Sequence, residues 1–199
     1  MKKILITGAR GGIALDVTRR LLENGHTVYA TVHNELDVAP LNEKLAGYGQ
    51  RAVVEKLDIL NESDQNKILE WEIDVLINNA AIGDSGPLAE IPVERVREVF
   101  ETNVVATLQL TQKVIKQMKE KAAGRIIFIS SLAGMIPTPF ISPYGLTKHA
   151  LENIASSLRF EVRKLGVKII TINPGGYATG FNKKNYKKKI DWLDESALN

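Results

Sequence analysis

Short apolar runs alternate with helix-forming segments along the whole chain, and some of these runs are apolar at consecutive positions. Ile4-Leu5-Ile6 and Ile126-Ile127-Phe128-Ile129 are the clearest examples. A strand of this kind needs cover on both of its faces, which is typical of a parallel sheet lying between two layers of helices. The predicted strands span residues 3–7, 27–32, 52–57, 74–77, 125–129 and 167–172.

The helices between these strands have readable ends. Asn24-Gly25 supplies a left-handed stop for the first helix, and Pro92 opens a long helix that continues to about residue 121. Ser142-Pro143 reads as an N-cap followed by a first-turn proline, and Gly166 ends that helix. The apolar stripes are Ile13, Val17 and Leu21 in the first helix and Leu151, Ile154, Leu158, Val162 and Leu165 in the last.

Strand, helix and strand repeated in this way predict right-handed crossovers and an α/β fold with a doubly wound parallel sheet in three α/β/α layers. A length of 199 residues is typical of one domain, so residues 1–199 are predicted to form a single unit. With 44% hydrophobic and 25% charged residues, the chain has the composition of a globular protein.

Composition also excludes several classes of site. The chain has no cysteine, which rules out disulfides, a thiol nucleophile and thiolate metal sites, and we expect no metal. No apolar run reaches the roughly 18 residues of a membrane span. The apolar stretch at residues 4–6 is too short for a signal peptide, so the sequence predicts a cytoplasmic protein without a membrane partner.

The net charge of +3 is concentrated in one place, because five lysines lie within residues 183–189. Away from this run the charges nearly balance, so we expect no nucleic-acid partner. The run is interpreted as a solvated surface, with a phosphate-binding stripe as the alternative.

Polar and small residues follow the ends of the predicted strands. In open α/β sheets ligands bind at the carboxyl ends of the strands, so these residues predict a site at one edge of the sheet. They are Thr7-Gly8, Asp58, Asn78-Asn79-Ala80-Ala81, Ser130-Ser131 and Asn173-Pro174-Gly175.

A glycine-rich turn joins the first strand to the first helix. Its glycines are Gly8, Gly11 and Gly12, followed by Ile13 and Ala14. Small residues there let backbone N–H groups approach a pyrophosphate at the helix N-terminus. The spacing is G-x-x-x-G-x-A, and a turn of purely structural importance is the alternative.

Tyr144 and Lys148 lie four residues apart and therefore on one face of the predicted last helix. A phenol needs a pKa lowered by about three units, or about 4 kcal/mol, to act as a base near pH 7. One ammonium at about 4–5 Å supplies about 3–4 kcal/mol at an effective dielectric of 20. This pair predicts a phenol made acidic by a neighbouring lysine, although the spacing also occurs by chance.

Two further polar residues are candidates. Ser131 ends the fifth strand, and its hydroxyl is suited to stabilise charge on a substrate oxygen; an ordinary loop serine is the alternative. Asn103 lies inside the long helix, where asparagine either marks a local kink or bulge or is simply exposed.

The order and spacing of these motifs resemble the short-chain dehydrogenase/reductase family over nearly the whole chain. The resemblance implies a single-domain Rossmann fold and an oxidoreductase that interconverts a secondary alcohol and a ketone or aldehyde with NAD(H) or NADP(H). The matching residues are Thr7-Gly8, Gly12-Ile13-Ala14, Asp58, Asn78-Asn79-Ala80, Asn103, Ser131, Tyr144, Lys148 and Asn173-Pro174-Gly175.

By this resemblance Tyr144 is the acid/base, while Lys148 lowers its pKa and holds the nicotinamide ribose. Ser131 orients the carbonyl or alcohol, and Asn103 anchors a water that relays protons from Lys148. Asp58 contacts the adenine, Asn79 lines the cofactor cleft, and Pro174 and Thr179 flank the nicotinamide. The full set of implied cofactor contacts is Thr7, Gly8, Arg10, Gly12, Ile13, His33, Asp58, Ile59, Asn79, Ala80, Ala81, Tyr144, Lys148, Pro174, Gly175 and Thr179.

The chain departs from the family pattern in two respects. Ala14 and Ala81 replace glycines, each adding a methyl group near the cofactor. Members of the family also run longer, so residues 175–199 are interpreted as a substrate loop and a shortened C-terminal segment without the last helix and edge strand. A nucleotide-binding module without turnover is therefore the alternative function.

The end of the second strand bears on the choice of cofactor. NAD sites place an acid there and NADP sites a cation. No acid occurs before Glu35, while Arg10 and His33 are suited to a 2′-phosphate, so NADP(H) is favoured over NAD(H). A plain surface histidine is the alternative for His33.

The resemblance also indicates the substrate and the partners. A small apolar alcohol or carbonyl compound is expected, and simple loop packing is the alternative for the residues that imply it. The outer faces of the helices over residues 92–121 and 142–165 predict a homodimer or homotetramer. The implied pocket residues are Ile82, Ala133, Met135, Ile136, Pro137, Phe140 and Tyr177.

Overall fold

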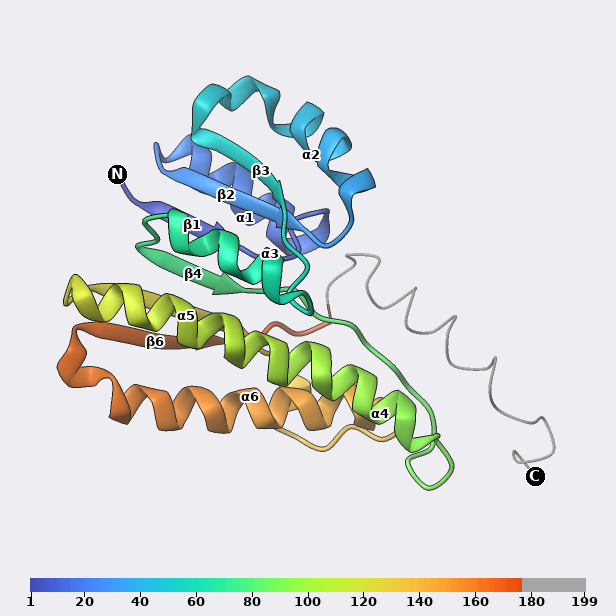
Figure 1. Cartoon of the computed structure of the whole chain (residues 1–199). Coiled ribbons are helices and arrows are strands. Elements are labelled where there is room, and N and C mark those ends of the chain that lie inside the picture. The colour runs from blue at the N-terminus through green and yellow to red at the C-terminus, as the bar shows by residue number, and fades with distance from the viewer. Residues whose placement is uncertain (177–199) are drawn as a thin grey trace.

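One parallel sheet organises the described part of the chain, residues 1–176 of a computed structural model (Figure 1). Within these residues the sheet has six strands in the order β3-β2-β1-β4-β5-β6, which is the doubly wound order of dinucleotide-binding folds. The strands are β1 (Lys3–Ile6), β2 (Thr27–Val32), β3 (Ala52–Lys56), β4 (Val75–Asn78), β5 (Gly124–Ile129) and β6 (Val167–Ile172).

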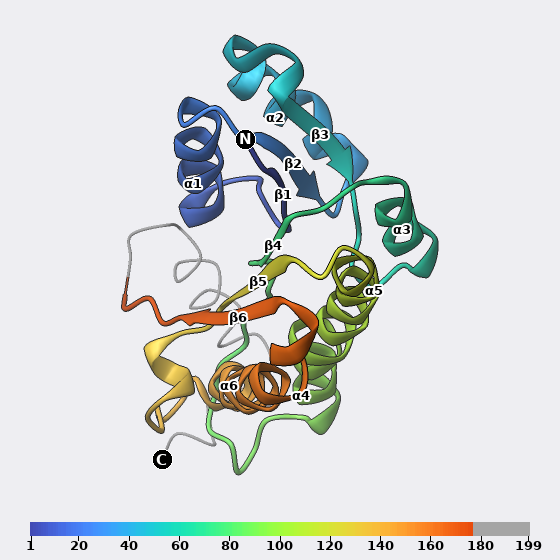
Figure 2. The same ribbon diagram turned by 90° about the vertical axis from the view of Figure 1, so that its left-hand side faces the viewer.

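Helices cover both faces of this sheet, which confirms the predicted three layers. Figure 2 shows α1 on one side of the sheet and α3 and α5 on the other. The helices are α1 (Gly12–Glu23), α2 (Val38–Leu45), α3 (Glu62–Lys67), α4 (Val93–Phe100), α5 (Thr107–Glu120) and α6 (Ser142–Glu161).

The alternation of side chains along each strand divides the core in two. Leu5 of β1 joins the cluster under α5 and α6, whereas its neighbours Ile4 and Ile6 join the cluster under α1 and α2. Because successive strand residues point to opposite faces, a run of three apolar residues supplies both clusters. The strand order reverses beside β1, which pairs with β2 on one side and with β4 on the other.

The long helix predicted from Pro92 is a continuous helical segment with a change of geometry in its middle. Between α4 and α5 lies a π-helical stretch, Glu101–Ala106. Asn103 is in this stretch and is 1% exposed. Of the two interpretations of Asn103, the bulge is therefore confirmed and the exposed position is wrong.

The buried face of α1 differs from the predicted stripe by one residue. Its buried residues are Ala14, Leu15, Thr18 and Leu22, whereas Ile13, Val17 and Leu21 are only half-buried. The small side chains of Ala14 and Thr18 let the helix lie close to the sheet, and the larger ones flank that contact. The inward face therefore combines these two small residues with Leu15 and Leu22.

The ends of α6 also differ slightly from prediction. Ser142 is the first helical residue and not the N-cap, a position that Ile141 occupies without a side-chain hydrogen bond. The helix ends at Glu161 and continues into a 3₁₀ turn, Arg163–Leu165. Gly166 follows in a left-handed conformation with φ 75°, so the helical segment ends at this glycine as predicted.

Several predictions fall outside the described residues. They concern Tyr177, Thr179, the lysine run at 183–189 and the C-terminal segment beyond Gly176. Among residues 1–176 no helix is both long enough and apolar enough to cross a membrane. The same part of the chain contains no cluster of histidine, aspartate or glutamate side chains able to hold a metal ion.

Candidate active site

The ends of β1 and β4 are joined by side chains at the point where strand order reverses. The hydroxyl of Thr7, which is 2% exposed, accepts hydrogen bonds from the backbone N–H groups of Asn79 and Ala80, both at 3.0 Å. The Asn79 amide donates to the carbonyls of Thr7 at 2.9 Å and Gly8 at 3.3 Å. The predicted residues of both strands therefore come together at one edge of the sheet.

The glycine-rich turn after β1 requires glycine at two positions. Gly8 has φ 71° and Gly12 has φ 60°, which are left-handed conformations that other residues rarely adopt. A Cβ on Gly8 would lie 3.0 Å from the Cα of Ala80, so the backbone of the β4 loop already fills that space. The turn thus leaves bare backbone at the N-terminus of α1, which is the geometry that suits a pyrophosphate.

Arg10 forms an ion pair within the protein, whereas His33 lies exposed at the end of β2. The guanidinium of Arg10 pairs with Asp37, with Nε 3.1 Å from Oδ1, and remains more than half exposed. His33 is exposed directly after β2. Asn34 follows and accepts a hydrogen bond from the backbone of Leu36 at 3.0 Å, which starts a 3₁₀ turn. No carboxylate lies at the end of β2 before Glu35, as the sequence indicates.

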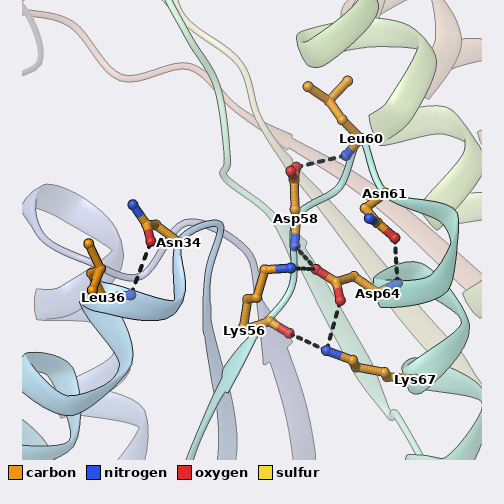
Figure 3. A network of polar contacts seen from close by, with 8 residues as sticks. All are labelled: Asn34, Leu36, Lys56, Asp58, Leu60, Asn61, Asp64 and Lys67. Carbon is orange, nitrogen blue, oxygen red and sulfur yellow. Dashed lines mark hydrogen bonds and ion pairs between the residues drawn. The ribbon is translucent and has the colours of Figure 1, made fainter.

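Asp58 lies after β3, within the polar network of Figure 3. Its backbone N–H donates to Asp64 Oδ2 at 3.0 Å, and its own Oδ1 accepts from the Leu60 N–H at 3.0 Å. Two lysines hold Asp64, with Lys56 Nζ at 2.7 Å and Lys67 Nζ at 2.8 Å. This network fixes the backbone on which Asp58 and Ile59 are carried.

Lys56 and Lys67 stabilise the ionised form of the Asp64 carboxyl group. Burial acts to raise the pKa of this carboxyl, but the hydrogen bonds from Lys56 and Lys67 outweigh burial and lower the pKa to about 2. The loop after β3 is therefore held by an ionised carboxylate throughout the neutral pH range.

The side-chain amide of Asn103 forms hydrogen bonds within the protein through both its oxygen and its nitrogen. Its Oδ1 accepts from the Ile82 N–H at 2.9 Å, and its Nδ2 donates to the Ile82 carbonyl at 2.8 Å. The same Nδ2 lies 3.0 Å from Thr147 Oγ1, which donates to the Tyr144 carbonyl at 2.7 Å. The buried amide therefore connects the loop after β4 with the first turns of α6.

Tyr144, Lys148 and Ser131 gather where β5 meets α6. Lys148 is 3% exposed; its Nζ donates to the Ile129 carbonyl at 2.7 Å and lies 5.3 Å from the centre of the Tyr144 ring. Ser131 ends the strand, and its Oγ accepts from the Ala133 N–H at 3.1 Å. A hydrogen bond also joins the Ser131 and Tyr144 side chains. The predicted trio is therefore brought together.

The pKa of Tyr144 does not move in the predicted direction. Burial raises the pKa of this phenol, and the hydrogen bond with Ser131 lowers it only in part. Lys148 is not among the groups that shift this pKa; its ammonium donates to the Ile129 carbonyl and lies over the Tyr144 ring. Burial lowers the pKa of Lys148 itself to about 8, although Glu152 acts to raise it.

The residues that follow β6 contact both α6 and the turn that carries Ser131. The Asn173 amide donates to Glu152 Oε1 at 2.5 Å and to the Ser131 carbonyl at 3.4 Å. The Pro174 carbonyl accepts from the Leu132 N–H at 3.1 Å. Pro174 and Gly175 thus lie beside the turn that carries Ser131.

The implied pocket residues are divided between the interior and the surface. Ala133 is 5% exposed, whereas Met135, Ile136 and Phe140 are 62%, 57% and 62% exposed. Pro137 is also exposed, and Ile82 is held by its backbone contacts with Asn103. The apolar side chains between Ser131 and Tyr144 are therefore accessible.

Three supporting elements were not predicted from the sequence. Thr147 lies inside the Tyr-x-x-x-Lys motif and is completely buried, a place where its hydroxyl needs a partner. The other two are the ion pairs of Asp64 with Lys56 and Lys67 and the ion pair of Asp84 with Arg95. Asp84 and Arg95 are 11 residues apart and Lys56 reaches Asp64 from β3, separations without a periodic signal; of these pairs, only that of Asp64 with Lys67 has helical spacing.

Comparison with known proteins gives a consistent result. The sequence model of the family described as short chain dehydrogenase matches residues 2–190. The NADPH-dependent 3-dehydrocapnine reductase of Ornithobacterium rhinotracheale is 31% identical over 188 residues, which cover 90% of this chain. The chain spans 66% of that relative's length, slightly less than two thirds.

Solved structures agree in fold. An actinorhodin polyketide ketoreductase variant with NADPH superposes with a TM-score of 0.87 at 26% identity, covering 99% of this chain and 79% of that one. NAD⁺-bound xylitol dehydrogenase has a TM-score of 0.85 at 24% identity, covering 92% and 74%. At that lower identity the likeness concerns the fold alone.

Proposed function

The chain belongs to the short-chain dehydrogenase/reductase family, and from this membership we propose that it is an NADP(H)-dependent oxidoreductase. It interconverts a secondary alcohol and a ketone or aldehyde, with Tyr144 as the acid/base. The observation that carries the proposal is the convergence of Ser131, Tyr144 and Lys148 at the carboxyl edge of the sheet, with Asn103 bonded behind them through Thr147.

The turn after β1 fits a dinucleotide. Left-handed backbone at Gly8 and Gly12 exposes N–H groups at the start of α1, and any side chain on Gly8 would meet Ala80. The residues proposed to hold the pyrophosphate and nicotinamide are Thr7, Gly8, Gly12, Ile13, Asn79, Ala80, Ala81, Lys148, Pro174 and Gly175. Asp58 and Ile59 are proposed to hold the adenine on the loop that Asp64 secures.

The bound cofactor supplies or accepts the hydride at the carbon of the substrate. In reduction, the Ser131 hydroxyl orients the carbonyl oxygen, and the Tyr144 phenol donates its proton to that oxygen. Tyr144 is left as a phenolate, which the Ser131 hydrogen bond stabilises until solvent returns the proton, while Lys148 is proposed to hold the nicotinamide ribose. Since the amide of Asn103 is occupied, a relay water there is proposed to bind a main-chain carbonyl of the π-helical stretch.

Two features support a preference for NADP(H). No acid at the end of β2 opposes a 2′-phosphate, and exposed His33 and Arg10 are suited to pair with one. For Arg10 to bind a phosphate, its guanidinium must share or leave Asp37. The relative and the ketoreductase with NADPH favour the same cofactor, although NAD⁺ occurs on this fold as well.

The raised pKa of Tyr144 favours reduction near neutral pH. A general acid works in its protonated form, so reduction is expected to stay active at neutral pH and to fall as the pH rises into the alkaline range where the phenol ionises. Oxidation needs the phenolate and is expected to rise over that same range. Rates measured in both directions across pH test this, and a rate of reduction that increases with alkalinity contradicts it.

An apolar substrate is proposed from the accessible side chains of Leu132, Met135, Ile136 and Phe140, which lie between Ser131 and Tyr144. Self-association through the outer faces of α4, α5 and α6 and a cytoplasmic location stay predictions from the sequence. Sedimentation at micromolar concentration tests the first.

A screen of NADPH and NADH oxidation against ketones of varied size tests the function. We expect turnover with apolar ketones and a higher kcat/KM with NADPH than with NADH. Cofactor binding by calorimetry without turnover on any carbonyl compound would instead indicate the nucleotide-binding module. The intact set of Ser131, Tyr144 and Lys148 favours the enzyme over that alternative.

A further inference from the structure

Two loops flank Tyr144 at the carboxyl edge of the sheet. We name residues 79–92 the β4–α4 loop and residues 130–141 the β5–α6 loop. They are joined by a backbone hydrogen bond in which the Gly86 N–H donates to the Phe140 carbonyl at 2.8 Å. Phe140 is four residues before Tyr144.

Both residues of this bond have unusual backbone conformations. Phe140 has φ 65°, which is uncommon and strained for a bulky side chain, and Gly86 has φ 149°. Such conformations persist where the surrounding structure imposes them. The surrounding structure therefore holds the contact between the two loops in place.

An ion pair holds the β4–α4 loop in position. Asp84 is 6% exposed and receives both Nε of Arg95 at 2.7 Å and a second guanidinium nitrogen at 2.9 Å. Asp84 Oδ1 also accepts from the Ser85 N–H at 2.7 Å, and Ser85 is completely buried. A guanidinium that donates two hydrogen bonds to one carboxylate fixes the orientation of the two side chains as well as their separation. Since Arg95 is in the first turn of α4, the loop is fastened to a helix.

The β5–α6 loop in turn lies tightly against the residues around Tyr144. A Cβ on Gly145 would lie 3.3 Å from both the Ala133 carbonyl oxygen and Thr138 Oγ1. A Cβ on Gly134 would lie 3.0 Å from backbone and side-chain atoms of Lys148. With no space between this loop and α6, a shift at Phe140 is passed to the substrate side of the site.

We propose that Asp84 and Arg95 are positioning residues for the substrate, because their ion pair fixes the β4–α4 loop and, through the Gly86–Phe140 bond, the β5–α6 loop beside Tyr144. The proposal rests on the proposed function for its kinetic consequence. Neither residue touches the reacting atoms. Their effect is on the shape of the space between the two loops, and therefore on substrate binding more than on the chemical step.

The kinetic test compares Asp84→Asn and the neutral double variant Asp84→Asn/Arg95→Gln with the parent enzyme. The double variant avoids an uncompensated buried charge if the single variant folds poorly. We expect KM for an apolar ketone to rise about tenfold with kcat within about twofold, the signature of lost uniform binding. NADPH affinity should be unchanged. Arg97→Gln is the matched control, because Arg97 forms an exposed pair with Glu94 on the same helix.

A second measurement needs no substrate. Amide hydrogen exchange of the full chain should become faster in residues 136–141 as well as in residues 82–91 when Asp84 is replaced, and should stay unchanged in Arg97→Gln. Faster exchange confined to residues 82–95, together with an unaltered KM, overturns the proposal. If the parent protein turns over no carbonyl compound, the proposed function fails, while the exchange result still decides whether the ion pair holds both loops.

Discussion

Replacing Tyr144 by phenylalanine is expected to lower the rate of ketone reduction by about 10²- to 10⁴-fold, the usual contribution of a positioned general acid. Phenylalanine keeps the ring that Lys148 faces at 5.3 Å and removes only the phenol oxygen that hydrogen-bonds Ser131. Binding of NADPH should therefore remain within a few-fold of the parent value. Single-turnover kinetics and calorimetry on the same preparation separate the two effects.

Tyr48→Phe is the matched control for this variant. The Tyr48 hydroxyl donates to Glu23 Oε1 at 3.1 Å on the surface of the protein, away from the sheet edge that carries Tyr144. Its removal should leave turnover unchanged. Undiminished reduction by Tyr144→Phe would exclude the phenol as the proton donor and, with it, the proposed mechanism.

Lys148→Met is expected to lose most of the activity while making the protein more stable at neutral pH. The pKa of Lys148 is lowered from 10.5 to about 8 by burial, so holding the charged form in the folded chain costs about 3 kcal/mol below pH 8. This cost is relieved as pH rises from about 8 to 10.5. Loss of the hydrogen bond to the Ile129 carbonyl offsets part of the gain, leaving the variant roughly 1–2 kcal/mol more stable at pH 7.

Urea unfolding at pH 7 and at pH 10 measures this difference, which should shrink at the higher pH because the folded parent then carries a neutral amine. Lys116→Met, at an exposed position of α5, serves as the control for removing one lysine. A variant less stable than the parent at pH 7, or one with full activity, contradicts the assignment.

Much of the fold could be predicted because the strands are short and doubly buried. Ile4-Leu5-Ile6 and Ile126-Ile127-Phe128-Ile129 contribute to clusters on both faces of the sheet. Burial on both faces requires apolar residues at consecutive positions, and the sequence shows such runs. Pro143 and Gly166 mark helix ends through backbone restrictions that hold in any context. Ser131 follows β5 and was therefore predictable at the carboxyl edge of the sheet, while the four-residue spacing put Tyr144 and Lys148 on one face of α6.

What could not be predicted depends on distances that only the folded chain defines. The pKa of Tyr144 follows from burial and from the hydrogen bond with Ser131, and the four-residue spacing to Lys148 describes neither. The inward face of α1 includes the small residues Ala14 and Thr18, which a stripe of large apolar residues does not mark. The bonds of Asn103 with Ile82 and of Asp84 with Arg95 join residues 21 and 11 positions apart, without any repeating pattern to reveal them.

The π-helical stretch Glu101–Ala106 means that α4 and α5 are one residue out of phase with a single continuous α-helix. One residue of an α-helix corresponds to a rotation of about 100°. Shortening this stretch by a one-codon deletion would therefore not simply trim the protein: it would swing either the Val99 side of α4 or the Leu110 side of α5 away from its buried surroundings. A change in the length of this segment displaces a whole helix face, so insertions and deletions should be the rarest kind of natural variation here.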